Sequence, residues 1–321
     1  MRILFLGSGP FGIPTLQRLH SLRDDLIVAT VPDAPFGRSH TPRPSTIKEE
    51  AISLGLEVLE AERLRGRQGQ QVLEDAAADL VITADIRLIL GDRFLQGPKC
   101  GCYNLHGSLL PRWRGAAPVV RALLAGDEQL GVTLYKMVAQ LDAGPVVAME
   151  SWTPPATVTT QQAEQHLSLL AAQLLERMLE SLESGDPPQT PQQEDLVTLA
   201  PKVEKPEGWA SWESSAIFVE RQVRALCPWP RTRTQVTRQG ASDGVAEELI
   251  LHRVSIVEGT QEAGPGFVLE VDAEKIVIAC GDGAIAVHRM QRSGKQPMEV
   301  ADLLRGMPFA AGDRFHAKEG V

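Results

Sequence analysis

The sequence predicts an α/β protein whose mostly parallel sheet has helices on both faces and is followed by a small antiparallel barrel. Two observations lead to this fold class. Between Met1 and Glu150, short apolar runs alternate with segments of helical spacing, which is the pattern of βαβ units. After Lys205 the pattern changes to short strand-like runs separated by turn residues, which is typical of a small barrel. With 321 residues, the chain is long enough for two domains.

The strands of the first domain are expected where apolar runs end at turn residues. Helical spacing separates the first five runs, as in Phe11–Leu22 and Thr46–Leu54, so these strands are expected to pair in parallel. The last two runs are separated only by VAQLDAGP, which is too short for a helical crossover, so an antiparallel pair is expected there. The runs are RILFLG, LIVATV, LEVLEA, LVITA, CYNLH, GVTLYKM and VVAMESW.

A long helix is expected after the sheet. Thr159 and Gln162 form a T-x-x-Q capping box, and Gly185 provides a stop signal. Apolar residues recur every three or four positions between them, which predicts a buried stripe. The stripe consists of Leu167, Leu170, Leu174, Met178 and Leu182. The polar, Pro-rich stretch GDPPQTPQQED then predicts a connector.

Beyond the connector, a helix from about Ser214 to Leu226 is expected before a series of short strands. The strand-like runs are RTQV, LILHRVSIV, GPGFVLEVD and KIVIACGDGAIAVHRMQ. Within the last run, GDG marks a tight hairpin. These runs together predict the antiparallel barrel.

Composition places the chain among ordinary globular proteins, with 43% hydrophobic and 23% charged residues. No apolar run approaches ~20 residues, so no membrane span is expected, and the N-terminus lacks the pattern of a secretory signal. The four cysteines are Cys100, Cys102, Cys227 and Cys280. Because they show no C-x-x-C spacing, we expect a reduced, cytoplasmic chain. Cys100 and Cys102, which are one residue apart, could be metal ligands, but with no His or Cys cluster nearby in the sequence we expect plain strand-entry residues and no metal site.

The N-terminal stretch LFLGSGPFG places Gly7, Gly9 and Gly12 in G-x-G-x-x-G spacing after an apolar run. Such a turn binds a dinucleotide when a strand precedes it, a helix follows it, and an acidic residue ends the second strand. Asp33 stands near that last position, but within the Pro-rich insertion VPDAPFGRSHTPRP. Dinucleotide binding therefore stays open beside a second interpretation, in which the glycines let a helix pack closely on the sheet.

The stretch NLHGSLLPRWRGAAP carries the strongest indication of chemistry. Asn104 and His106 are two residues apart on a predicted strand, so both side chains project from one face at the edge where open α/β sheets bind ligands. The pair could donate hydrogen bonds to an oxyanion, or it could be a buried pair that satisfies loop backbone. Asp142, in the turn LDAG, could act as a base in the same crevice or be a turn residue. No Ser or Cys elbow accompanies these residues, so the substrate would bring its own nucleophile.

The chain as a whole is acidic, with 32 Lys and Arg against 41 Asp and Glu and a net charge of -9. This average argues against a globally basic nucleic-acid binder, although local patches can differ from it. Five arginines from Arg221 to Arg238 occur with no acidic residue among them. The run is open to two interpretations, a site for a phosphate-bearing partner or a solvated face.

The N-x-H of Asn104 and His106, followed by SLLPRWRG and LDAG, resembles the folate-dependent formyltransferases. TVPDAPFGR is similar to the tRNA-contacting loop of that family, LAPKVEKPEG to its linker, and VRALCPWP with GDGAIAVHRMQRSGKQPMEVADLLRGMPFAAGDRF to its C-terminal domain. The resemblance implies a Rossmann-like catalytic domain at 1–185, a linker at 186–205, and an OB-like tRNA-binding domain at 206–321. It also implies that the glycines of GSGPFG are packing residues and that no NAD is bound.

The resemblance further implies a one-carbon transfer reaction. The formyl donor would be 10-formyltetrahydrofolate as co-substrate, and the acceptor would be the α-amine of methionyl initiator tRNA, with no metal, no membrane and no obligate protein partner. Asp142 with His106 would act as the base, and Asn104 with His106 would stabilise the oxyanion. The folate-binding residues would be Ser108, Leu109, Leu110 and Pro111. The tRNA-binding residues would be Arg38, Arg43, Arg221, Arg224, Arg231 and Arg233.

Some positions depart from the family pattern. Asp85 and Arg87, in ADIRLIL, stand where the family usually has an aromatic residue and Gly, and Ala143 replaces the usual Thr. The loop after Arg38 also lacks the usual Gly and lysines. Hydrolysis of the formyl donor and formylation of a sugar amine use the same three chemical residues and remain alternatives. An NAD-dependent oxidoreductase and a non-catalytic RNA-binding module are more distant ones.

Overall fold

The computed structural model describes residues 1–36, 41–239, 246–257 and 263–318, in two compact units. Unit 1 consists of Met1–Val119, Glu128–Pro154 and Gln162–Pro201. Unit 2 consists of Val120–Asp127, Pro155–Gln161 and Lys202–Val321. Residues 186–201 of the segment predicted as a linker thus belong to unit 1.

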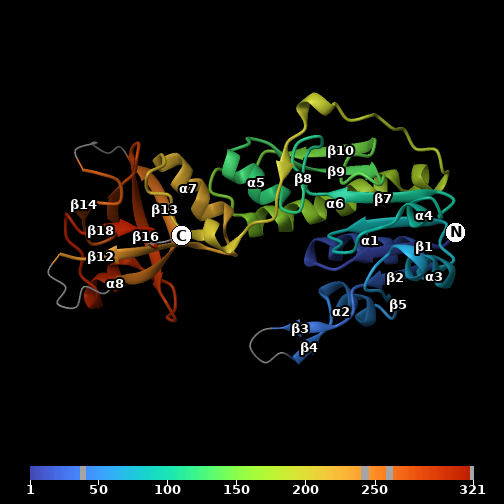
Figure 1. Ribbon diagram of the computed structural model, residues 1–321, viewed down its shortest axis with the longest axis horizontal. Coiled ribbons are helices and arrows are strands. Elements are labelled where there is room, and N and C mark those ends of the chain that lie inside the picture. The colour runs from blue at the N-terminus through green and yellow to red at the C-terminus, as the bar shows by residue number, and fades with distance from the viewer. Residues whose placement is uncertain (37–40, 240–245, 258–262, 319–321) are drawn as a thin grey trace. The chain divides into compact units, whose positions relative to one another are not determined.

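Unit 1 is built on a seven-stranded sheet in the order β10-β9-β7-β6-β1-β2-β5 (Figure 1). Its strands are β1 (Ile3–Gly7), β2 (Leu26–Thr30), β5 (Glu57–Glu60), β6 (Leu80–Ala84), β7 (Gly101–His106), β9 (Leu130–Lys136) and β10 (Val146–Trp152). The pairs among β5, β2, β1, β6 and β7 are parallel, whereas β9 is antiparallel to both β7 and β10. The mostly parallel sheet and the antiparallel pair at its edge are therefore confirmed.

Helices cover both faces of this sheet, as predicted. Leu4 and Leu6 of β1 share a core cluster with Val72 of α3. Phe5 points to the opposite face, where its ring and Ile47 of α2 meet beside the backbone of the first turn. The first six helices are α1 (Ile13–Leu22), α2 (Thr46–Ser53), α3 (Gly66–Ala76), α4 (Asp92–Leu95), α5 (Pro118–Ala125) and α6 (Thr160–Glu183).

Helix α6 is the predicted long helix, and it ends just before Gly185, whose φ of +82° is the left-handed conformation of a helix stop. It lies beside α1, and an ion pair of 2.6 Å joins its Glu183 to Arg23, the residue that follows α1. Its buried face consists of Ala163, Leu167, Ala171, Leu174, Leu175, Leu179 and Leu182. Leu170 and Met178, which we predicted to be buried, are only half-buried.

The glycines of the N-terminal turn make room for protein atoms. A Cβ at Gly7 or Gly12 would lie 3.0–3.1 Å from atoms of the Phe5 ring, and a Cβ at Gly9 would lie 1.8 Å from Oδ2 of Asp85. Desolvation by the surrounding protein raises the pKa of Asp85. Because the side chain of Asp85 fills the space against this turn, the contacts favour the packing interpretation of the glycine motif.

Two short strand pairs complete unit 1. The Pro-rich insertion after β2 forms a hairpin of β3 (Ala34–Phe36) and β4 (Thr41–Arg43), which we did not predict. The tRNA-binding candidate Arg38 lies outside the described residues. Strand β8 (Arg114–Gly115) pairs in parallel with β11 (Leu199–Ala200), which follows the short 3₁₀ helix η2 (Glu194–Leu196).

Unit 2 contains the predicted antiparallel barrel. Its elements are α7 (Ala216–Ala225), β12 (Thr232–Thr237), β13 (Glu247–Val257), β14 (Val268–Val271), β15 (Ile276–Ala279), β16 (Ala284–Arg292), β17 (Met298–Glu299), α8 (Val300–Gly306) and β18 (Arg314–His316), after the 3₁₀ helix η3 (Lys205–Gly208). The sheet order is β14-β15-β16-β13-β12-β18, with β17 on β16, and the predicted GDG hairpin joins β15 to β16. Backbone hydrogen bonds from Val268 to Asp313 and from Phe315 to Gly266, both 2.8 Å, join the two end strands.

The helices of the described part of the chain are all too short or too polar to cross a membrane. Within the same residues, no group of three or more His, Cys, Asp and Glu side chains is placed to hold a metal ion.

Candidate active site

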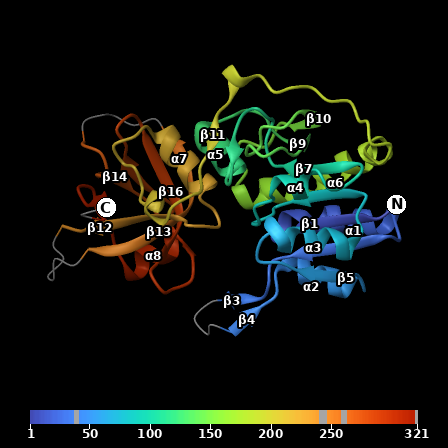
Figure 2. The ribbon, with the colours of Figure 1, turned by 45° about the vertical axis from the view of Figure 1, so that its right-hand side comes forward.

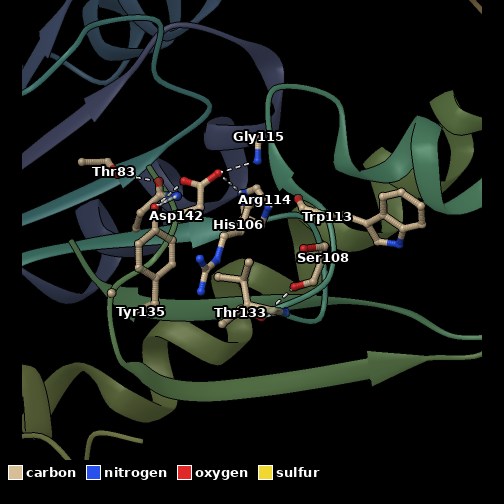
Figure 3. A network of polar contacts seen from close by, with 12 residues as sticks. Thr83, His106, Ser108, Trp113, Arg114, Gly115, Thr133, Tyr135 and Asp142 are labelled. Atoms are coloured by element: carbon tan, nitrogen blue, oxygen red, sulfur yellow. Dashed lines mark hydrogen bonds and ion pairs between the residues drawn. The ribbon is translucent and has the colours of Figure 1, made fainter. Parts of the chain in front are cut away.

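The predicted residues Asn104 and His106 lie on β7 and expose only 8% and 6% of their surfaces. The strand register places Thr83 of β6 and Tyr135 of β9 on either side of Asn104, and Thr133 of β9 beside His106. Residues that face each other on paired strands share one side of the sheet. These five side chains therefore form a polar row near the carboxyl ends of β6 and β7. Figure 3 labels four of them, Thr83, His106, Thr133 and Tyr135.

Two hydrogen bonds orient the amide of Asn104. The Thr83 hydroxyl donates to its Oδ1 at 2.5 Å, and its Nδ2 donates to the Tyr135 hydroxyl at 3.3 Å. An amide nitrogen carries two hydrogens. Among the described residues, the second hydrogen of Nδ2 has no acceptor, so it is available to a bound ligand.

Asp142 lies in the turn between β9 and β10, with a left-handed backbone (φ +51°) and 8% of its surface exposed. Its Oδ1 accepts a hydrogen bond of 2.7 Å from the Tyr135 hydroxyl, and its Oδ2 accepts one of 2.8 Å from the backbone N–H of Gly115. Tyr135 thus links Asp142 to Asn104 through a single hydroxyl group. The structure brings Asn104, His106 and Asp142 together. Figure 3 labels His106, Tyr135 and Asp142 of this group.

The phenol of Tyr135 stays protonated in this position. Burial raises its pKa well above the ordinary value, and the charge of Asp142 and the hydrogen bond to that carboxylate raise it further. A protonated phenol can donate to Asp142 while it accepts from Asn104. Tyr135 therefore sets the orientation of both groups.

The imidazole of His106 lies between a carbonyl and a carboxylate. Its Nε2 is 2.9 Å from the carbonyl oxygen of Trp113, and its Nδ1 is 3.8 Å from Oδ2 of Asp142. Because a carbonyl oxygen only accepts, Nε2 carries a hydrogen, and Nδ1 is the nitrogen that faces Asp142. A hydrogen bond from Nε2 to an oxyanion would require the contact with Trp113 to open.

The predicted folate segment, residues 108–111, is fastened to β9. The Thr133 hydroxyl donates to the Ser108 carbonyl at 2.6 Å and accepts from the Leu110 backbone N–H at 3.1 Å. The Ser108 hydroxyl donates to the Arg112 carbonyl at 2.7 Å, so it is not prepared as a nucleophile. Ser108 and Leu110 are buried, which leaves the half-buried Leu109 and Pro111 to offer apolar surface from this segment.

The predicted tRNA-binding arginines of unit 2 differ in their contacts. Arg224 makes two hydrogen bonds with the Glu220 carboxylate, at 2.5 and 3.0 Å, and Arg221 donates to the Ala125 carbonyl. Arg233 lies 3.8 Å from a carboxylate oxygen of Glu248.

Arg231 donates to Nδ1 of His252 at 3.2 Å and pairs with no carboxylate in the part of the chain that the structure describes. Burial lowers the pKa of His252, and the positive charges of Arg231 and Arg289 lower it further, so this imidazole is neutral and able to accept. In unit 1, Arg43 is exposed on β4.

Several site residues were missed in the sequence. Thr83, Thr133 and Tyr135 lie on correctly predicted strands, but their role depends on which strands are neighbours and in which register. The signal that could have found them is the spacing of Thr133 and Tyr135, two residues apart like Asn104 and His106. Trp113 and Gly115 contribute only backbone groups to the site, so their side-chain types give no indication of this role.

The site combines a carboxylate, an imidazole and an oriented amide, and among the described residues no side chain beside them is prepared as a nucleophile. This arrangement is typical of a group-transfer enzyme. Comparison with known families agrees with this class. Residues 1–179 match the family described as formyl transferase, and residues 202–308 match the formyl transferase C-terminal domain. The chain belongs to the formyl transferase family.

Relatives that match nearly the whole chain carry the name of a particular enzyme of this family. The chain is 38% identical over 316 residues to a methionyl-tRNA formyltransferase of Dechloromonas aromatica (strain RCB), which covers 98% of this chain and 99% of the relative. It is also 38% identical over 316 residues to the methionyl-tRNA formyltransferase of Ruegeria pomeroyi (strain ATCC 700808 / DSM 15171 / DSS-3), covering 98% and 100%.

Solved structures of lower identity show the same fold. HypX from Aquifex aeolicus in complex with tetrahydrofolic acid has a TM-score of 0.59 at 21% identity, covering 95% of this chain. This chain spans about half of HypX, since the match covers 47% of that protein. The sugar 3N-formyl transferase WlaRD has a TM-score of 0.64 at 13% identity, with coverage of 92% of this chain and 99% of that one.

Proposed function

We propose that this protein transfers the formyl group of 10-formyltetrahydrofolate to the α-amine of methionyl initiator tRNA. The observation that carries the proposal is the match of 98% of the chain, both units included, to relatives named methionyl-tRNA formyltransferase. The sugar formyl transferase shares the fold at only 13% identity, so acylation of a sugar amine has weaker support.

The proposed reaction exchanges one C–N bond for another. The neutral amine attacks the formyl carbon, its bond to that carbon forms, and the bond from the carbon to N10 of the folate breaks. The amine must lose a proton, and N10 must gain one. Asp142, beside His106, is the group proposed to accept the proton from the amine, and the available hydrogen of Asn104 would stabilise the oxyanion.

The buried position of this site supports the chemistry. Asn104, His106 and Asp142 each expose less than a tenth of their surface, at 8%, 6% and 8%. A hydrogen bond to a developing negative charge is stronger where water is excluded. The half-buried Leu109 and Pro111 would hold the folate beside these groups through apolar contact.

The tRNA would be held by arginine–phosphate contacts. Within the described ranges, the candidates from unit 2 that make no hydrogen bond to a carboxylate are Arg221, Arg231 and Arg233, and Arg43 is the described candidate from unit 1. A phosphate contact positions the RNA and leaves specificity to other contacts. All four cysteines are free, which agrees with the cytoplasm as the proposed location.

A formylation assay tests the proposed function directly. The full chain with labelled 10-formyltetrahydrofolate should formylate charged initiator tRNA, while uncharged tRNA and a nucleotide-linked amino sugar should accept no label. Consumption of the donor should be slow until charged tRNA is added, because the amine is the missing reactant. Rapid release of formate without tRNA would instead support a hydrolase, and labelling of the amino sugar would support a sugar formyltransferase.

Replacement of Arg231 and Arg233 by glutamine should weaken binding of tRNA and flatten its salt dependence by about one slope unit for each phosphate that is no longer bound. Measurement of the dissociation constant of charged tRNA at several salt concentrations checks this expectation. Donor binding should not change. Arg224→Gln is the matched control, because Arg224 is held by Glu220 and should not affect the slope. An unchanged slope in the double variant would remove these arginines from the tRNA-binding surface.

A further inference from the structure

The segment that leads from α6 to β11 is hydrogen-bonded to β10 near its start and to β8 at its end. We name residues 190–200 the strap (Figure 2). Near its start, Thr190 exchanges two backbone hydrogen bonds of 2.8 Å with Val146 of β10. At its end, β11 pairs with β8, which carries the Gly115 N–H that binds Asp142. The sequence predicted this segment only as a polar linker.

Within the strap, Gln192 contacts the turn that carries Asp142. Its Nε2 donates to the backbone carbonyl of Asp142 at 2.8 Å and to that of Gly144 at 2.7 Å. One amide nitrogen thus uses both of its hydrogens to hold the two carbonyls on either side of Ala143. This contact fixes the backbone of the turn in which Asp142 adopts its left-handed conformation.

The other end of the same amide contacts Arg114. Oε1 of Gln192 accepts from Nε of Arg114 at 3.0 Å and from its Nη2 at 2.9 Å. Arg114 exposes only 4% of its side chain, and its charge is balanced by two hydrogen bonds to Glu194, also in the strap, at 2.8 and 3.2 Å. This guanidinium lowers the pKa of Glu194.

These contacts close a ring around the Asp142 carboxylate. Asp142 accepts from the N–H of Gly115, Gly115 is bonded covalently to Arg114, Arg114 donates to Gln192, and Gln192 donates to the carbonyl of Asp142. The side chain and the backbone of Asp142 are therefore held by two adjacent residues of β8, and Gln192 is the connection between them. A shift of Gln192 would move the turn relative to the N–H that orients the carboxylate.

We propose that Gln192 is a positioning residue, which holds Asp142 in the geometry required for proton transfer; the proposal rests on the proposed function. The amide of Gln192 satisfies both carbonyls with the two hydrogens of Nε2 and satisfies the guanidinium with its oxygen Oε1. A glutamate would place an oxygen against the two carbonyls, and a methionine would leave them without donors. Misplacement of a reacting group by about 1 Å can cost on the order of 100-fold in rate.

The test compares Gln192→Glu and Gln192→Met with the matched control Gln193→Ala in the full chain. Gln193 is the neighbouring glutamine, and its side chain is exposed. The measurements are kcat, the KM of each substrate in the formylation assay, and the melting temperature. Both Gln192 variants should lose roughly 100-fold in kcat with little change in either KM, because they displace the proton acceptor and not the substrates. Gln193→Ala should behave like the wild type.

Three results would overturn the proposal. They are an unchanged kcat in a folded Gln192 variant, a loss confined to KM, and failure of both variants to fold, which would make Gln192 a residue for stability alone. A wild-type protein that does not formylate charged tRNA would instead reject the proposed function. The two failures are therefore distinguishable.

Discussion

Asp142→Asn is expected to lower kcat for formyl transfer by about 100- to 10,000-fold, which is the range for loss of a general base. The substitution keeps the shape of the side chain. Its remaining carbonyl oxygen can accept from Gly115, and its new amide can donate to the Tyr135 hydroxyl, which accepts in turn. The variant should therefore fold and bind both substrates, and only the proton acceptor is lost. Single-turnover rates with charged tRNA give the measurement.

The surface variant Asp24→Asn provides the control, since this exposed aspartate of unit 1 carries the same change in charge. It should have wild-type activity. The melting temperatures of both variants establish that they are folded. If Asp142→Asn turned over at a near wild-type rate, the proton would have to leave through another group, and the proposed role of Asp142 would be rejected.

Asn104→Ala is expected to cost roughly 100- to 1000-fold in kcat, the usual effect of removing one donor to an oxyanion. The substitution removes the available hydrogen of Nδ2 and also the two hydrogen bonds to Thr83 and Tyr135. Since the donor acts on charge that develops only in the transition state, the loss should appear in kcat and leave the KM of both substrates nearly unchanged.

Thr83→Val distinguishes the effect of the Asn104 donor from the effect of the hydrogen bond that orients it. This variant leaves the Asn104 amide in place but removes the hydroxyl that donates to Oδ1. It should lower kcat far less than Asn104→Ala does. Equal losses in the two variants would show that burial of an unsatisfied polar group, and not a missing oxyanion donor, explains the defect.

The order of strands and helices in unit 1 could be predicted because the buried strands have continuous apolar runs and the crossovers have helical spacing. The pair Asn104 and His106 could be predicted for a similar reason, since two polar residues with strand spacing interrupt an apolar run. The hairpin of β3 and β4 was missed because its Pro-rich sequence lacks the apolar alternation of a strand that packs on a core.

Contacts that depend on tertiary register could not be predicted. Tyr135 faces Asn104 because β9 turns back along β7, and nothing in the run GVTLYKM states which residue will face it. Gln192 stands in a stretch whose composition is that of a connector, and it reaches the Asp142 turn only because the strap is paired with β10 and β8. In both cases the sequence pattern of one segment could not show which other segment would lie beside it.

The position of β18, which pairs with β12 and also bonds to the start of β14, affects how unit 2 folds. Thr234 of β12 bonds to the carbonyl of His316, 82 positions further along the chain, so this pairing waits until nearly the whole unit has been synthesised. Pairings this distant in sequence slow folding, because the entropy of the intervening chain is lost before they contribute. Once formed, the hydrogen bonds from Val268 and Phe315 pair the edge of β14 with the edge of β18. The finished barrel is thereby protected from edge-to-edge association with other chains, whereas its unclosed precursor is open to it.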